Sequence, residues 1–106
     1  MPGRDSFRGG EWAGGYAEGM DAYEDQLAAA LILQIRAEMV VRHMDQKDLS
    51  EAAGMERSTL NRYLKGRRAL PALTLFKVAG CFGMAPSELL REAEARVKRA
   101  HSSVHA

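Results

Sequence analysis

The chain has 106 residues, of which 46% are hydrophobic and 27% charged, and its formal net charge is +1. This length suits one small domain and argues against a multidomain enzyme, and the composition is that of a globular protein rather than a wholly disordered chain. The single cysteine, Cys81, excludes an internal disulfide and a cysteine zinc cluster, and it suits a reducing cytoplasm.

Residues 1–20 contain six glycines and show neither helical nor strand periodicity. Glycine at this density raises the entropic cost of ordering a chain, so we expect a flexible, acidic arm. Trp12 and Tyr16 are unusual in such a segment and could dock on the domain or on a partner. The arm has no apolar core and no cleavage site of a secretion signal, which favours a cytoplasmic protein.

The first predicted helix covers residues 21–42. Asp21 and Glu24 have the spacing of a capping box at its start. Apolar residues then recur at steps of three and four and form one stripe: Ala28, Leu31, Ile32, Ile35 and Met39. The longest apolar stretch, residues 27–35, is too short to span a bilayer.

Two short helices follow. Asp45 is the predicted N-cap of a helix that starts at Gln46 and stops at Gly54, where a glycine suits a left-handed helix end. After a three-residue turn, residues 57–66 form the second short helix, closed by Gly66. Two further helices are predicted, over residues 74–83 and, with Pro86 at the first position, over residues 86–100.

No segment shows strand alternation, so the sequence predicts an all-α fold of five helices with short connections. We divide it into a flexible arm (1–20), a helical domain (21–92) and a C-terminal helix extension with a tail (93–106). In the fourth helix the apolar residues are Leu75, Phe76, Val78, Ala79 and Phe82.

Two short helices joined by a tight glycine-containing turn, with the second helix basic, form a helix-turn-helix arrangement. Leu49 and Ala53 on the first helix are expected to face Leu60 and Tyr63 on the second, with Ser50 at the close crossing and Met55 plugging the turn. Residues 57–68 contain five basic side chains and no acid, which is where a polyanion would bind. A cationic block alone is more often a solvated face, but its place in a helix-turn-helix arrangement favours the binding of a polyanion.

Residues 46–66, followed by residues 67–90, resemble the Cro and phage-repressor type of helix-turn-helix domain, the XRE family. The resemblance runs from about Leu31 to Leu90 and includes Gln46, Gly54, Gly66 and the tail LFKVAGCFGMAPSELL. It implies a sequence-specific DNA-binding protein, usually a repressor that binds double-stranded DNA as a two-fold dimer.

The resemblance assigns roles to single residues. Gln46 would contact DNA at the start of the first short helix, and the positions of the second helix that match base-reading positions are Arg57, Ser58, Asn61 and Arg62. Thr59 and Lys65 also face outward on this helix. Lys65, together with Arg67 and Arg68 just beyond the helix, would bind phosphates.

The sequence departs from the family pattern in three ways. Many members carry a buried arginine paired with a glutamate where this chain has Met39 and Leu64, a joint change that replaces an ion pair by apolar packing. Glu56 stands where serine or threonine usually caps the recognition helix; it suits the helix dipole but would face DNA phosphates. Ser50 replaces the more usual alanine, which we expect to be harmless.

Other candidate sites are weak. His101 and His105 have the spacing of metal ligands on a helix, but no further donor completes a site, so we expect surface histidines. Cys81 lies among apolar residues and is expected to be a core thiol. No nucleophile–base arrangement, paired carboxylates or phosphate loop is present, so we expect no enzyme, no metal and no cofactor.

The end of the last helix offers a partner surface. A thin seam at heptad spacing could form a dimer or could pack back onto the domain; its residues are Leu90, Ala93, Val97, Ala100 and Val104. The arm is either an inert tail, a segment that folds back on the basic face and competes with DNA, or a minor-groove arm carrying Arg4 and Arg8. Residues 1–25 hold two arginines and six acids, which favours the first two.

The sequence thus predicts a small cytoplasmic, nucleoid-associated transcriptional regulator, most simply a dimeric repressor similar to a phage immunity repressor that blocks a promoter. A protein antagonist could control it. One alternative is the antitoxin of a toxin–antitoxin pair, with the arm or last helix wrapping a toxin. The other is a helix-turn-helix module that binds proteins and no DNA, which Glu56 and the acidic arm would favour.

Overall fold

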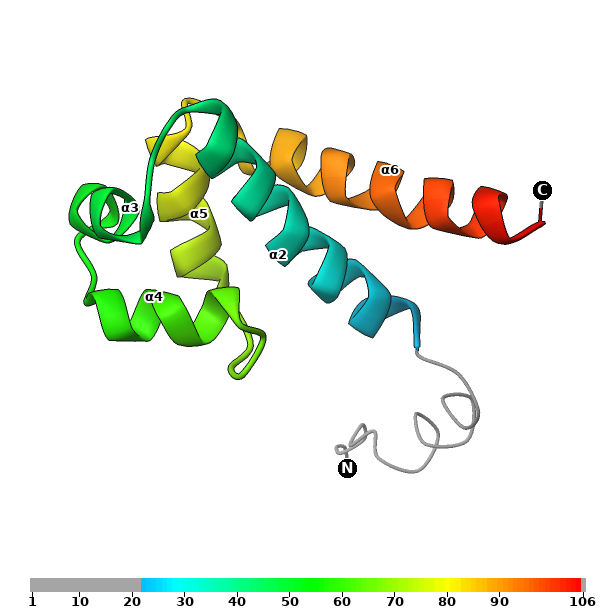
Figure 1. Ribbon diagram of the computed structural model, residues 1–106, viewed down its shortest axis with the longest axis horizontal. Helices are drawn as coiled ribbons and strands as arrows, with labels where there is room; N and C mark the ends of the chain where they lie inside the picture. Colours follow the sequence, from blue (N-terminus) through cyan, green and yellow to red (C-terminus); the bar gives the residue numbers. More distant parts are fainter. Residues whose placement is uncertain (1–21, 106) are drawn as a thin grey trace, which may run out of the picture.

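A computed structural model of the protein describes residues 22–105, and this part of the chain contains five α-helices and no strand. They are α2 (Tyr23–Val41), α3 (Gln46–Ala53), α4 (Arg57–Leu64), α5 (Ala72–Cys81) and α6 (Pro86–His105). In Figure 1 the long helices α2 and α6 run roughly antiparallel, and α3, α4 and α5 cluster around the C-terminal end of α2. The predicted all-α fold is therefore confirmed, whereas the expected arm lies outside the described residues.

Most helix boundaries lie within two residues of the prediction. α2 starts at Tyr23 with Ala22 as its N-cap and no side-chain cap, and the proposed cap Asp21 is outside the described residues. α5 starts at Ala72, earlier than expected, because Pro71 with its fixed φ serves as the N-cap. α6 continues past residue 100 to His105, so the C-terminal extension is part of one continuous helix.

The hydrophobic core joins all the helices of the described chain. Its fully buried large side chains are Ile35, Leu49, Leu60, Val78 and Leu89. Two expectations about facing need correction: Ala28 is exposed, and Phe76 is 52% exposed. On α2 the buried stripe instead includes Ala30 and Gln34, because α6 covers that side of the helix.

The most extensive helix contact in the fold is that between α2 and α6. Ala93 and Val97 of α6 are buried there, so the first half of the predicted seam packs back onto the domain, while Ala100 stays exposed. Gln34, itself buried, accepts a hydrogen bond from Arg96 Nε (2.6 Å) and donates one to Glu38 (2.8 Å). A buried amide with both ends satisfied fixes how the two helices align.

Arg42 ties the end of α2 to the end of α5. Its Nε and Nη2 donate to the carbonyl oxygen of Phe82 at 3.2 and 2.9 Å, and its guanidinium lies 5.0 Å from the centre of the Phe82 ring. The same guanidinium pairs with Glu38 one turn earlier. The carbonyl at the end of α5 therefore receives a charged donor in place of water.

Between residues 22 and 105 no single helix has both the length and the apolar character needed to cross a membrane. Only α5 and most of α6 taken together reach those values, and the chain bends by 99° between them.

Candidate nucleic-acid interface

A capping box fixes the start of α3. Asp45 Oδ1 accepts from the backbone N–H of Asp48 (2.8 Å), and the Asp48 carboxylate accepts from the backbone N–H of Asp45 (3.0 Å). The predicted N-cap is confirmed. The hydrogen bond from the Asp48 backbone is the main cause that lowers the pKa of Asp45 below its ordinary value of 3.8, and the charges of Arg57 and Lys47 add to it.

The turn between α3 and α4 has the geometry that its residues favour. Gly54 has a φ of 68°, in the left-handed region, and the Met55 N–H donates to the Ser50 carbonyl (2.9 Å). Ser50 is buried, and its hydroxyl donates to the Lys47 carbonyl (2.9 Å), so this polar side chain is satisfied inside its own helix. The four residues expected to face one another between the two helices are all buried: Leu49, Ala53, Leu60 and Tyr63.

The far end of α4 is held by α2. Met39 and Leu64 both belong to the hydrophobic core, which agrees with apolar packing in place of an ion pair. One turn before Met39, the Arg36 guanidinium donates to the Leu64 carbonyl oxygen through Nη2 (2.6 Å) and Nε (3.2 Å). Sequence reasoning missed Arg36, because nothing in the local pattern of α2 shows that this residue lies beside the end of α4.

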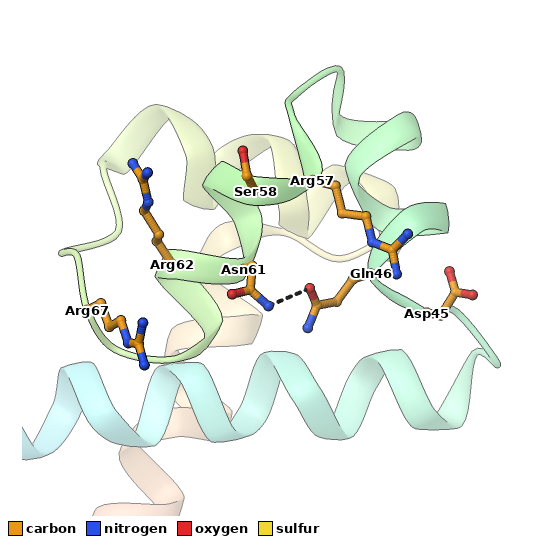
Figure 2. Close-up of a pocket in the computed structure, with 7 residues that line it drawn as sticks. All are labelled: Asp45, Gln46, Arg57, Ser58, Asn61, Arg62 and Arg67. Atoms are coloured by element: carbon orange, nitrogen blue, oxygen red, sulfur yellow. Dashed lines mark hydrogen bonds between the residues drawn. The ribbon is translucent and has the colours of Figure 1, made fainter.

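α3 and α4 together form an open depression of about 720 Å³ on the outside of the molecule (Figure 2). Its lining combines three arginines with two amides, a hydroxyl and a carboxylate: Asp45, Gln46, Arg57, Ser58, Asn61, Arg62 and Arg67. In Figure 2, Arg57 lies on the α3 side beside Asp45 and Gln46, whereas Arg62 and Arg67 lie on the other side of Asn61. The hydrogen-bond donors therefore line an open surface and not a closed cavity.

Two amides at the centre of the depression are paired. Asn61 Nδ2 donates to Gln46 Oε1 at 3.0 Å, which links α4 to the start of α3 (Figure 2). The pair leaves the Asn61 carbonyl oxygen and the Gln46 amide N–H groups for other partners. Each amide has therefore lost part of its rotational freedom before any ligand arrives.

The predicted binding residues divide into two sets in space. Six of them line the depression: Gln46, Arg57, Ser58, Asn61, Arg62 and Arg67. Thr59, Lys65 and Arg68 do not; Thr59 is half-buried, Lys65 is the C-cap of α4, and Arg68 lines a separate cavity against α2. The carboxylate of Asp45 belongs to the depression although the sequence suggested only a capping role for it.

Glu56 is the N-cap residue of α4, exposed and without a side-chain capping bond. Its carboxylate is therefore not held by α4, and the charge lies beside the otherwise cationic surface that starts at Arg57. Negative charge at a helix N-terminus suits the helix dipole but would repel a polyanion bound nearby.

The side chains considered for other chemistry have ordinary surroundings. The expected core thiol, Cys81, is only half-buried against the core, and this partial burial raises the pKa of its thiol. His101 is exposed, and its Nε2 lies 3.0 Å from Gln26 Oε1.

Comparison with known proteins agrees with this geometry. A family model described as helix-turn-helix matches residues 35–89, just over half of the chain. The chain is similar in fold to the crystal structure of the clp gene regulator ClgR from Corynebacterium glutamicum, with a TM-score of 0.64 and 21% identity over 74% of this chain and 86% of that one. No curated protein matches the sequence.

Proposed function

Because this chain belongs to the helix-turn-helix family of DNA-binding domains, which are not enzymes, we propose that it is a transcription regulator that recognises one specific duplex sequence. The observation that carries the proposal is the depression of α3 and α4, where arginine and amide donors converge on one open surface. Such donors match the acceptors that base edges and phosphates present in the major groove.

The residues take distinct roles in this proposal. α4 enters the major groove, with Arg57, Asn61 and Arg62 reading base edges and Ser58 supporting them. A bidentate arginine–guanine contact is worth about 1–3 kcal/mol of discrimination against the wrong base. Arg67, which follows the helix, contacts phosphates and sets register rather than sequence.

We further propose a dimer that acts as a repressor in the nucleoid. One eight-residue helix reads few bases, so a second copy would supply the affinity and select an inverted repeat. The two half-sites would lie about 34 Å apart, one DNA turn. A dimer seated over a promoter would exclude polymerase by steric overlap.

The proposal is tested by selecting a random duplex pool on the full chain for several rounds and titrating the enriched site with salt. We expect one inverted repeat, and a log–log salt slope of about −0.9 for each phosphate neutralised. Arg57→Ala and Arg62→Ala should relax preference at particular bases, whereas Arg67→Ala should weaken all sequences alike and flatten the slope by about one.

Two results would contradict parts of the proposal. An enriched site without two-fold symmetry, bound by one chain, would remove the dimer and leave a monomeric DNA-binding protein. Failure to enrich any site, with no binding even at low salt, would remove the regulator itself and favour a protein-binding role of the same fold.

A further inference from the structure

A second cavity, of about 440 Å³, lies between the first half of α2 and the loop that follows α4. Small-ligand sites span about 300–1,000 Å³, so it is large enough for one aromatic side chain. Six of its lining residues are apolar, and the others are a glycine and two charged groups: Ala28, Ala29, Leu31, Ile32, Ala69 and Leu70, with Gly66, Asp25 and Arg68.

The segment that precedes α2 is attached beside this cavity. α2 begins directly after Ala22, and Asp25 and Ala28 of the cavity lie within two turns of it, about 9 Å along the axis. Trp12, the only tryptophan of the chain, is separated from Ala22 by nine residues, a length that spans up to about 30 Å. The chain between them is therefore long enough for the indole to reach the cavity.

Charge also favours the segment that precedes α2 as the occupant of this cavity. Residues 1–21 carry two arginines against four acidic residues, and Glu11 directly precedes Trp12. The loop beside the cavity carries Lys65, Arg67 and Arg68 and no acid. Arg68, one of the lining residues, can pair with a carboxylate and lie over an aromatic ring.

A weak contact is enough to populate a docked state, because the segment is covalently attached to the domain. A short flexible linker gives an effective concentration on the order of millimolar, so a contact with a millimolar dissociation constant is already half populated. An indole that leaves water removes about 150–250 Å² of surface, which is a large contribution for a single side chain.

We propose that Trp12 occupies this cavity in the DNA-free protein, with Glu11 facing Arg68, and that the segment thereby masks part of the cationic loop. The docking itself is independent of the proposed function. The masking rests on the proposed function, because the masked loop carries side chains that we assign to phosphate contacts.

Tryptophan fluorescence of the full chain tests the docking without DNA, because all of the signal comes from Trp12. We expect an emission maximum at shorter wavelength, and weaker quenching by acrylamide, than in the same chain unfolded in guanidinium. Both should be independent of protein concentration. Emission and quenching equal to those of the unfolded chain would overturn the docking, and unmasking on dilution would show instead that the occupant is the segment of a second copy.

A matched pair of variants locates the cavity. Ala28→Glu places a carboxylate in it at an exposed position of α2, where folding is expected to persist, and should unmask Trp12. Ala100→Glu makes the same change in the neighbouring groove between α2 and α6 and should leave the fluorescence unchanged. Unmasking by Ala100→Glu and not by Ala28→Glu would overturn the assignment to this cavity.

DNA affinity tests the masking. If at least half of the molecules are docked, Trp12→Ala should tighten binding to the selected duplex about twofold or more, whereas Tyr16→Ala should leave it unchanged. Equal affinity of Trp12→Ala and the unaltered chain would overturn the masking. If neither chain binds DNA, the proposed function and the masking both fail, while the fluorescence result stands by itself.

Discussion

The pair α2–α6 and the pair α3–α4 are stabilised in different ways. α2 and α6 are about 20 residues each, and they bury apolar side chains along their contact. α3 and α4 have eight residues each, and each buries only three. Helices that short are not stable alone, so caps and neighbouring elements must supply what their own length does not.

The contrast follows from what the two pairs present to solvent. The outer face of α4 carries the side chains of the candidate interface, and these are exposed or half-buried. α4 is therefore stabilised on its inner side. Leu60 and Leu64 pack in the core, and Arg36 donates a hydrogen bond to the carbonyl oxygen of Leu64. A binding surface can thus remain polar while its backbone is held rigidly.

The largest effect is expected where the two pairs meet. Met39→Arg places a charge in the core without a partner and should lower the free energy of unfolding by about 3–5 kcal/mol. Adding Leu64→Glu gives the new arginine a carboxylate partner, so the double variant should be more stable than Met39→Arg alone. Urea unfolding of the four chains gives the coupling energy. Additive effects of the two changes would show that the side chains do not meet.

Leu60→Ala tests whether α4 shares the common core. Leu60 is 1% exposed, and its truncation should lower the free energy of unfolding by about 2–5 kcal/mol. Leu73→Ala, at an exposed position of α5, should change it by less than about 0.5 kcal/mol. Both far-ultraviolet circular dichroism and the nuclear magnetic resonance signals of the Tyr63 ring should report one transition. Earlier loss of the Tyr63 signal would mean that α3 and α4 unfold separately.

Arg36→Ala tests the support that α2 gives to α4. Loss of the charged donor to the Leu64 carbonyl should destabilise the domain by about 1.5–3 kcal/mol, at the lower end because the arginine is exposed. It should also weaken DNA binding, because the end of α4 loses its fixed position. Arg91→Ala, which removes an exposed arginine from α6, serves as the control in denaturation and in binding. Equal effects of the two variants would show that Arg36 acts only as an exposed charge and does not support α4.

The amide pair is the next test, now within the interface. If Gln46 holds Asn61 for base contact, a cycle of Gln46→Ala, Asn61→Ala and the double variant should show a coupling of about 0.5–3 kcal/mol in DNA affinity. Gln46→Ala combined with Arg62→Ala should be additive within about 0.5 kcal/mol. Additivity in the first cycle would mean that each amide acts alone.

The smallest effect concerns the cap of α3. The pKa of Asp45 is lowered in the folded protein, so its stabilisation is complete above its ordinary value of 3.8 and is lost as the pH falls through the lowered value. Asp45→Ala should reduce the melting temperature at neutral pH. Asp45→Asn should keep most of the cap and lose this part of the acid dependence. An acid profile of Asp45→Asn that matches the unaltered chain would assign the dependence to other carboxylates.

The amino-acid sequence alone determined the helices and the turn of the helix-turn-helix. Asp45, Gly54 and Pro86 act through bonds and φ angles within a few residues, and the apolar steps of three and four identify part of the buried face of α2, through Leu31 and Ile35. Short-range interactions of this kind can be read directly from neighbouring residues. For that reason the predicted ends of α3 and α4 lie within two residues of the observed ones.

Only the tertiary structure decided how these elements are held together and which side chains share a surface. Arg36 meets Leu64 across 28 positions of sequence, Arg96 meets Gln34 across 62, and Asn61 meets Gln46 across 15. Arg67 lines the depression and Arg68 lines the cavity against α2, a separation that also depends on where α2 lies. Partners of this kind depend on the packing angles of whole helices, and a local sequence pattern carries no record of those angles.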